Sequence, residues 1–295
     1  MGLLQKSDWK ARWISGNYTV NPVKRYPVDC FKKEFDTTDV KNARIYVSAC
    51  GLYELALNGK RVGDFVLAPG HTDYRKRVQY QTYDVTEQIK SGNNVITASL
   101  ADGWYRGSCG AWGLKNQYGA QTKLLVQLEI EKNDGTRQTV VTDGSWAWSN
   151  DGERVFADNQ DGEKVDARLV PTYSYKAKVT RHSVTPTASN NVPIREKETF
   201  VNPKIIITPS GKKVLDFGQN IAGYIKFSFN APVIFPSVIS FFISSAKVIT
   251  LSGRLPAAFT RDFSTSARFN SILNFILCSI MSFALAAILK KIPLI

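Results

Sequence analysis

Cysteine is scarce in this sequence, and its spacing excludes two classes of protein. The four cysteines are Cys30, Cys50, Cys109 and Cys278, and no two of them form a C-x-x-C pair. They are too few for a disulfide scaffold, and no zinc-finger spacing accompanies them. We therefore expect free, mostly buried thiols in a protein of a reducing compartment.

A concentrated basic run is also absent, although the formal net charge is +13. The sequence contains no block of lysine and arginine and no helix-turn-helix pattern, which argues against nucleic-acid binding. The first fifteen residues carry Lys6, Asp8 and Lys10 and lack an apolar core. This pattern predicts no secretory signal and a cytoplasmic location.

Alternating apolar residues between 43 and 168 predict β-strands. In KLLVQLEIEK, Gln127 and Glu129 fall on one face of a strand. The apolar residues fall on the other face: Leu124, Val126, Leu128 and Ile130. The turn sequence NDG (133–135) follows directly and predicts a hairpin, and Asn58-Gly59 predicts another. Strands recurring about every ten residues, with no long helical pattern, indicate an all-β fold, an antiparallel β-sandwich or jelly roll.

The organisation of the chain changes twice. Residues 187–194, TASNNVPI, are polar and lack periodicity, which predicts a linker. A second β-segment begins near Val201. We expect a β-sandwich domain at 1–170, a linker and the start of a second β-module at 171–232, and an apolar tail at 233–295 for which a helix is one alternative.

The densest group of candidate functional residues lies in LADGWYRGSCGAWG, residues 100–113. Aromatic rings pack on the apolar face of a sugar, and aspartate or arginine can bind its vicinal hydroxyls. The alternative is structural, with the tryptophans filling a core and Asp102 capping a turn. The candidate carbohydrate-binding residues are Asn58, Asp73, Asp102, Trp104, Tyr105 and Arg106.

Two other polar groups are weaker candidates. His71 lies close to Asp73, but no nucleophile or third orienting group accompanies the pair, so we interpret His71 as a loop residue. The acidic residues near 158–166 could bind Ca²⁺ through oxygen ligands, although their spacing is not that of an EF-hand. The candidate calcium ligands are Asp158, Asp161 and Glu163, and the alternative is a solvated turn. We expect no required cofactor.

Several segments in order resemble the N-terminal β-sandwich module of bacterial α-L-rhamnosidases. The resemblance covers about residues 9–170. Its segments are Trp13-Ile14, ARIYVSACGLYELALNGKRVGD, VLAPGHTDYRKRVQYQTYDVT, LADGWYRGSCGAWG and DGEKVDARL. In addition, TPSGKKVLDFGQNIAGYIKF (208–227) resembles the start of the next module of those enzymes, a second β-sandwich.

The resemblance implies a galactose-binding-like sandwich followed by a concanavalin-like one. It also implies L-rhamnose-containing glycosides as partners. The family hydrolyses terminal α-L-rhamnose with inversion, using a carboxylic acid and a carboxylate base on an (α/α)₆ barrel that follows these modules. The module in this chain would then bind carbohydrate or only support the catalytic domain.

The residues after Pro232 do not resemble the family, and Asp262 is the one acidic residue among them. We interpret 233–295 as the product of a lost reading frame, which would leave a truncated enzyme without its barrel, inactive alone. An alternative is a membrane-tethered carbohydrate-binding protein, because residues 271–289 form an uncharged run just long enough to span a bilayer. A third is a hydrolase assembled with a separately encoded barrel.

Overall fold

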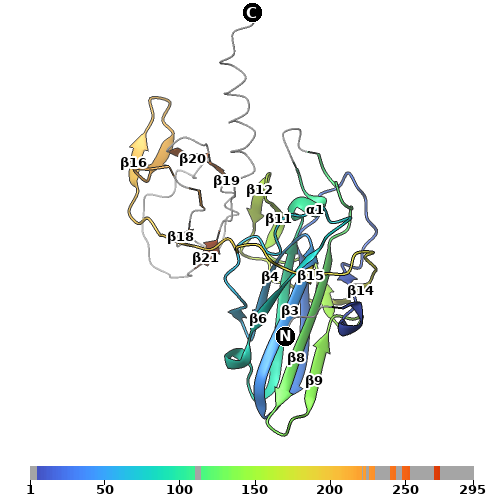
Figure 1. Cartoon of the computed structure of the whole chain (residues 1–295). Helices are drawn as coiled ribbons and strands as arrows, with labels where there is room; N and C mark the ends of the chain where they lie inside the picture. The colour runs from blue at the N-terminus through green and yellow to red at the C-terminus, as the bar shows by residue number, and fades with distance from the viewer. Residues whose placement is uncertain are drawn as a thin grey trace, which may run out of the picture.

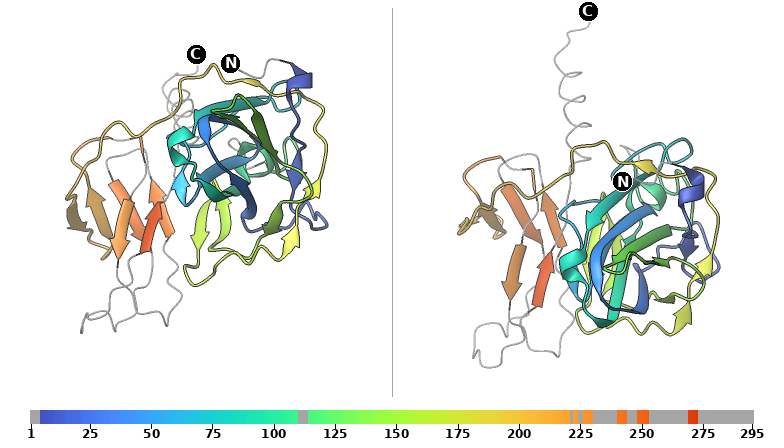
Figure 2. Two further views of the ribbon diagram at one scale, coloured as in Figure 1. Left: turned by 90° about the horizontal axis from the view of Figure 1, so that it is seen from below. Right: turned by 60° about the horizontal axis from the view of Figure 1, so that its bottom comes forward.

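The computed structural model describes residues 5–109, 114–220, 222–223, 226–229, 240–243, 248–252 and 269–272. The two largest β-sheets pack face to face, as Figure 1 shows. The predicted all-β sandwich is thereby confirmed. Figure 2 shows the same two sheets from below and from an oblique direction.

The first sheet has seven strands, six of them in the order β14-β1-β8-β3-β6-β15, with β9 paired to β8. Their bounds are β1 (Ile14–Ser15), β3 (Val40–Cys50), β6 (Gln79–Asp84), β8 (Lys123–Lys132), β9 (Arg137–Val141), β14 (Lys178–Val179) and β15 (Thr187–Ala188). The second sheet has the order β13-β10-β2-β7-β4-β5. Its strands are β2 (Asp29–Thr37), β4 (Leu52–Leu57), β5 (Lys60–Arg61), β7 (Gly92–Ala101), β10 (Ala147–Ser149) and β13 (Tyr175–Lys176).

Shorter elements lie around the sandwich. A separate hairpin is formed by β11 (Arg154–Asp158) and β12 (Gly162–Val165), and α1 (Gly103–Arg106) is a single helical turn. Two 3₁₀ turns cover Lys6–Asp8 and Thr86–Gln88. The β11–β12 hairpin and α1 matter most for function, because they border the sites considered below.

The core between the sheets is built from the predicted alternating residues. On β8 the side chains of Leu124, Val126, Leu128 and Ile130 are buried, and β3 and β4 add further apolar side chains. Each fully buried side chain of this size contributes about 1.5–3 kcal/mol. The opposite face of β8 is covered as well, because the backbone N–H groups of Lys10 and Ala11 donate to Gln127 Oε1.

Glycine 51 allows the chain to pass from the first sheet to the second. It lies between β3 and β4 with φ +137°, a conformation that L side chains rarely adopt. A methyl group at this position would lie 2.5 Å from the carbonyl oxygen of Ala101. The backbones of β4 and β7 can therefore pair here only with glycine at position 51.

The two predicted turns are confirmed. Asn58 and Gly59 both have positive φ between β4 and β5, as a tight hairpin turn requires. Gly135 has φ +81° in the turn between β8 and β9, where Asp134 accepts a hydrogen bond from the N–H of Thr136.

The sandwich continues beyond residue 170, where we expected a boundary. Strands β13 and β14 pair with β10 and β1, and β15 pairs with β6 in parallel. The predicted linker at 187–194 is also attached to the sandwich, because Val66 N–H donates to the carbonyl oxygen of Ile194 at 2.8 Å. A strand of two residues is too short to show a periodic pattern in the sequence. The sequence therefore predicted the end of the sandwich domain at residue 170, before these strands.

The described residues after 200 form further strands. These are β16 (Lys204–Ile207), β17 (Lys213–Asp216), β18 (Lys226–Phe229), β19 (Ser240–Ile243), β20 (Val248–Ser252) and β21 (Phe269–Ile272). One sheet has the order β16-β17-β20-β19, and β18 pairs with β21. Apart from β19, β20 and β21, the predicted tail at 233–295 lies outside the described residues. Within those residues, no helix is long and apolar enough to cross a membrane, and of the run 271–289 only residues 271 and 272 are described.

Candidate functional site

The loop that begins at Asp102 is packed tightly against the sandwich. All four residues of α1 are buried. A methyl group at Gly103 would lie 2.6 Å from Leu52 Cγ, and one at Gly107 would lie 2.2 Å from Asp158 Oδ2. These two glycines allow close packing against β4 and β11.

Arg106 and Asp102 form a buried ion pair. Their side chains are 4% and 9% exposed, and Nη2 of Arg106 lies 2.6 Å from Asp102 Oδ1. The guanidinium also donates to the hydroxyl of Tyr18 and lies over the ring of Tyr26, 5.3 Å from its centroid. The charged groups of both predicted sugar-binding residues therefore have partners inside the protein.

A second buried carboxylate belongs to the same group of charges. Asp29 is fully buried and accepts hydrogen bonds from Thr122 Oγ1 at 2.7 Å and from Trp148 Nε1 at 3.0 Å. Burial raises the pKa of Asp29, and the positive charge of Arg106 opposes this rise. We call Asp29, Asp102 and Arg106 the buried charge cluster. Its arrangement is that of a structural network.

Asp102 is a second member of the buried charge cluster whose ionisation depends on its burial. Burial raises its pKa from 3.8 to about 6, although Arg106 acts in the opposite direction. The folded state therefore binds a proton more tightly than the unfolded state. Stability from this group is fully present below about pH 4 and is lost as the pH rises through about 6.

Asp102→Asn is expected to remove this part of the pH dependence. From pH 4 to pH 7, the free energy of unfolding of the unchanged chain should fall relative to that of the variant by up to about 3 kcal/mol. Urea denaturation of both chains at several pH values measures the difference. Burial lowers the pKa of His71 and of His182, but both histidines are present in both chains and cancel in the comparison. A difference that stays constant with pH would contradict the raised pKa.

Trp104 and Tyr105 face a second apolar cluster. They are 7% and 3% exposed and pack in a group that includes Tyr74 and Leu125. The ring of Tyr105 meets that of Tyr74 edge-on, with centroids 5.3 Å apart. Most of the surface of Trp104 and Tyr105 is thus used in packing, which agrees with the structural alternative for these residues.

The outer edge of this cluster is accessible. His71 is exposed and stacks on Trp104, with centroids 5.4 Å apart. Asp73 is half-buried and accepts a hydrogen bond from Arg75 Nε at 3.1 Å, and Arg75 lies over the ring of Tyr118. We call these five residues the aromatic patch. Residues 110–113, including Trp112, are outside the described part of the chain.

Asn58 lies away from the other predicted residues. It follows Leu57, which pairs with Ile96, whereas Asp102 follows Ala101, which pairs with Leu52 at the other end of β4. Six strand residues separate the two positions by about 20 Å. The Asn58 amide donates to Asn94 Oδ1 and accepts from Val95 N–H, so it holds a turn.

The three calcium candidates are held by protein donors. Asp158 accepts hydrogen bonds from the backbone N–H groups of Ser108 and Asp161, and Asp161 itself pairs with Arg25. Glu163 pairs with Arg154 at 2.7 Å. Within the described ranges, no group of three or more histidine, cysteine, aspartate or glutamate side chains is arranged to hold a metal ion.

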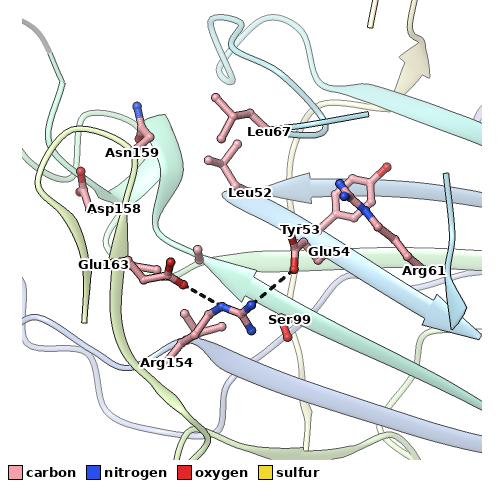
Figure 3. A pocket seen from close by; sticks show the side chains of 13 residues that line it. Leu52, Tyr53, Glu54, Arg61, Leu67, Ser99, Arg154, Asp158, Asn159 and Glu163 are labelled. Carbon is pink, nitrogen blue, oxygen red and sulfur yellow. Dashed lines mark hydrogen bonds and ion pairs between the residues drawn. The ribbon is translucent and has the colours of Figure 1, made fainter. Parts of the chain in front are cut away.

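An open pocket lies between β4, β7 and the β11–β12 hairpin, as Figure 3 shows. Its volume is about 630 Å³, including the part open to solvent. Arg154 crosses the pocket wall between Glu163 and Glu54. The sequence analysis did not identify Arg154 or Glu54, because they come from strands about a hundred residues apart. Only the acidic residues near 158–166 pointed to this region.

Comparison with known proteins gives the family. A family model described as the Alpha-L-rhamnosidase N-terminal domain matches residues 38–209. The chain belongs to this family. The resemblance seen in the sequence is thereby confirmed.

Two relatives of this chain are named α-L-rhamnosidases. An α-L-rhamnosidase of Streptomyces avermitilis is 40% identical over 203 residues, which are 63% of this chain and 19% of the relative. An α-L-rhamnosidase of Formosa agariphila is 34% identical over 249 residues, 76% of this chain and 26% of the relative. The chain thus spans about a fifth to a quarter of the length of these relatives.

Solved structures of the family share the fold. The α-L-rhamnosidase of Aspergillus terreus superposes with a TM-score of 0.71 at 33% identity, over 78% of this chain and 28% of its own. The Streptomyces avermitilis enzyme, solved in complex with L-rhamnose, gives a TM-score of 0.66 at 37% identity, over 70% of this chain and 21% of its own.

Proposed function

We propose that this chain provides the non-catalytic N-terminal part of an α-L-rhamnosidase and recognises L-rhamnose-containing glycosides. The match of residues 38–209 to the N-terminal domain of this family carries the proposal. The complex of the Streptomyces avermitilis relative with L-rhamnose supports the choice of sugar. Catalysis would reside in the part of the relatives that this chain does not match, which is most of their length.

The ionic contacts of the described carboxylates favour recognition over hydrolysis. Glycoside hydrolysis requires one carboxyl group to donate a proton while a second acts as base or nucleophile. Asp73 is paired with Arg75, and Glu163 with Arg154. Paired carboxylates and guanidinium groups suit the binding of hydroxyl groups, because each presents fixed acceptors or donors.

Two measurements on the full chain test the proposal. We expect no release of nitrophenol from an aryl α-L-rhamnoside, and calorimetric binding of L-rhamnose with a dissociation constant on the order of 1 mM, about 4 kcal/mol. Repeating the titration with Ca²⁺ and with a chelator tests the calcium prediction. Turnover at ordinary enzyme rates, about 1–1000 per second, would contradict the non-catalytic role. Absence of binding would contradict recognition.

A further inference from the structure

The pocket of Figure 3 holds a guanidinium group between carboxylates from different strands. Arg154 on β11 lies 2.7 Å from Glu163 Oε1 on β12 and 3.8 Å from Glu54 Oε2 on β4. The side chains of Glu163, Arg154 and Glu54 are 12%, 27% and 37% exposed. Each carboxylate can accept several hydrogen bonds, so both retain acceptor positions beyond their contact with Arg154.

Asn159 lines the same pocket and has an unusual environment. It is 7% exposed, and both its Oδ1 and its Nδ2 are buried without a hydrogen-bond partner among the described residues. An unpaired buried polar group is costly, so such a group in a native structure requires an explanation. Both atoms are covered in the unliganded chain, and a ligand hydroxyl that reached them would satisfy the amide, because a hydroxyl donates and accepts.

The remaining walls and the charges define the ligand class. Val28, Leu52, Leu67 and Ala101 provide an apolar surface beside the polar groups. An anion in this pocket would meet Glu54 and Glu163, and a cation would meet Arg154, so neither charge is favoured throughout. A neutral ligand with several hydroxyls and an apolar face fits both surfaces.

We propose that this pocket, rather than the aromatic patch, binds a neutral hydroxyl-rich ligand. The amide of Asn159 and the carboxylate of Glu163 contact its hydroxyls, and Arg154 donates to a ligand oxygen. The choice of L-rhamnose as the probe rests on the proposed function. The proposal for the pocket rests on the contacts of Arg154, Glu163 and Asn159.

Asn159→Leu distinguishes a binding residue from a structural one. The substitution removes two unpaired polar atoms and keeps a similar volume, so we expect an unchanged or higher melting temperature. We also expect the affinity for L-rhamnose to fall at least tenfold, measured by calorimetry on the full chain. Asn94→Leu is the matched control for stability. Asn94 is equally buried but bonds to Asn58, Lys90 and Gly92, so its loss should lower the melting temperature.

Further variants separate the two candidate sites. Glu163→Gln keeps an acceptor for Arg154 and should also reduce the affinity at least tenfold. Glu131→Gln, which alters an exposed ion pair with Lys41 at 2.9 Å, and His71→Ala in the aromatic patch should bind like the unchanged chain. D-glucose and glycerol, titrated in parallel, test other neutral ligands. Affinity for L-rhamnose, D-glucose or glycerol that falls in Asn159→Leu and Glu163→Gln, and not in the two control variants, would support the pocket.

Three outcomes separate failure of the pocket from failure of the proposed function. Loss of rhamnose binding in His71→Ala alone would overturn the pocket and keep rhamnose recognition. Binding of glucose but not rhamnose, lost in Asn159→Leu, would support the pocket and contradict the choice of sugar. No binding of any of the three compounds at tens of millimolar would overturn both. If Asn159→Leu proves less stable, Glu163→Gln decides between these outcomes.

Discussion

Replacing Arg106 with methionine should lower the free energy of unfolding by about 3–5 kcal/mol. Arg106 is the cation of the buried charge cluster, and its removal leaves the carboxylates of Asp102 and Asp29 without their compensating charge. Methionine keeps most of the aliphatic volume, so the loss reflects the charge more than a cavity. Guanidinium denaturation of the full chain at pH 7 measures the effect.

The control for this prediction is an exposed ion pair with equally short geometry. Arg168 and Asp166 lie 2.6 Å apart, and the Arg168 side chain is half exposed. Arg168→Met should change stability little, because water replaces the lost partner. The loss from Arg106→Met should also be smaller at pH 5, where Asp102 is largely protonated. Equal effects of the two variants would contradict the importance of the buried charge cluster.

Replacing Trp104 with alanine should cost about 3–5 kcal/mol of stability. The side chain is 7% exposed and packs with Tyr74 and Leu125, so alanine would leave a cavity. The sequence left open a role as a sugar contact, for which the same substitution would abolish binding and preserve the fold. Thermal denaturation, together with calorimetric titration of L-rhamnose, measures both properties on one variant.

His71→Ala is the matched control, because His71 forms the exposed side of the same ring stack. It should change stability by roughly 0.5 kcal/mol or less, as most surface substitutions do. A Trp104→Ala chain with normal stability and no affinity for rhamnose would instead place the sugar on the aromatic patch.

The longer strands of the sandwich could be predicted because their alternation and their turns are visible in the sequence. The alternation from Leu124 to Ile130 and the turn at Asn58-Gly59 specify strand faces and hairpins without knowledge of the fold. The strands β13, β14 and β15 leave no such record. Each has two residues, and its pairing depends on the neighbouring edge strands.

The sites were harder to predict, because burial of a charged group is a property of the assembled fold. Arg106 lies in a glycine-rich segment, yet it is buried, bonded to Asp102 and to Tyr18 of the N-terminal segment. Asp158 resembles a calcium ligand in sequence, but backbone N–H groups occupy its oxygens. The pocket depends on the register between β4 and β7, which places Glu54 opposite Ser99 on the pocket wall.

A crystal structure of the full chain in the presence of L-rhamnose tests the central claim most directly, namely that this family member recognises rhamnose in the pocket between β4, β7 and the β11–β12 hairpin. We predict one sugar ring in that pocket, with its hydroxyls in hydrogen-bond contact with the Asn159 amide and the Glu163 carboxylate. A pocket that holds no sugar, with L-rhamnose bound at the aromatic patch or nowhere on the chain, would contradict the claim.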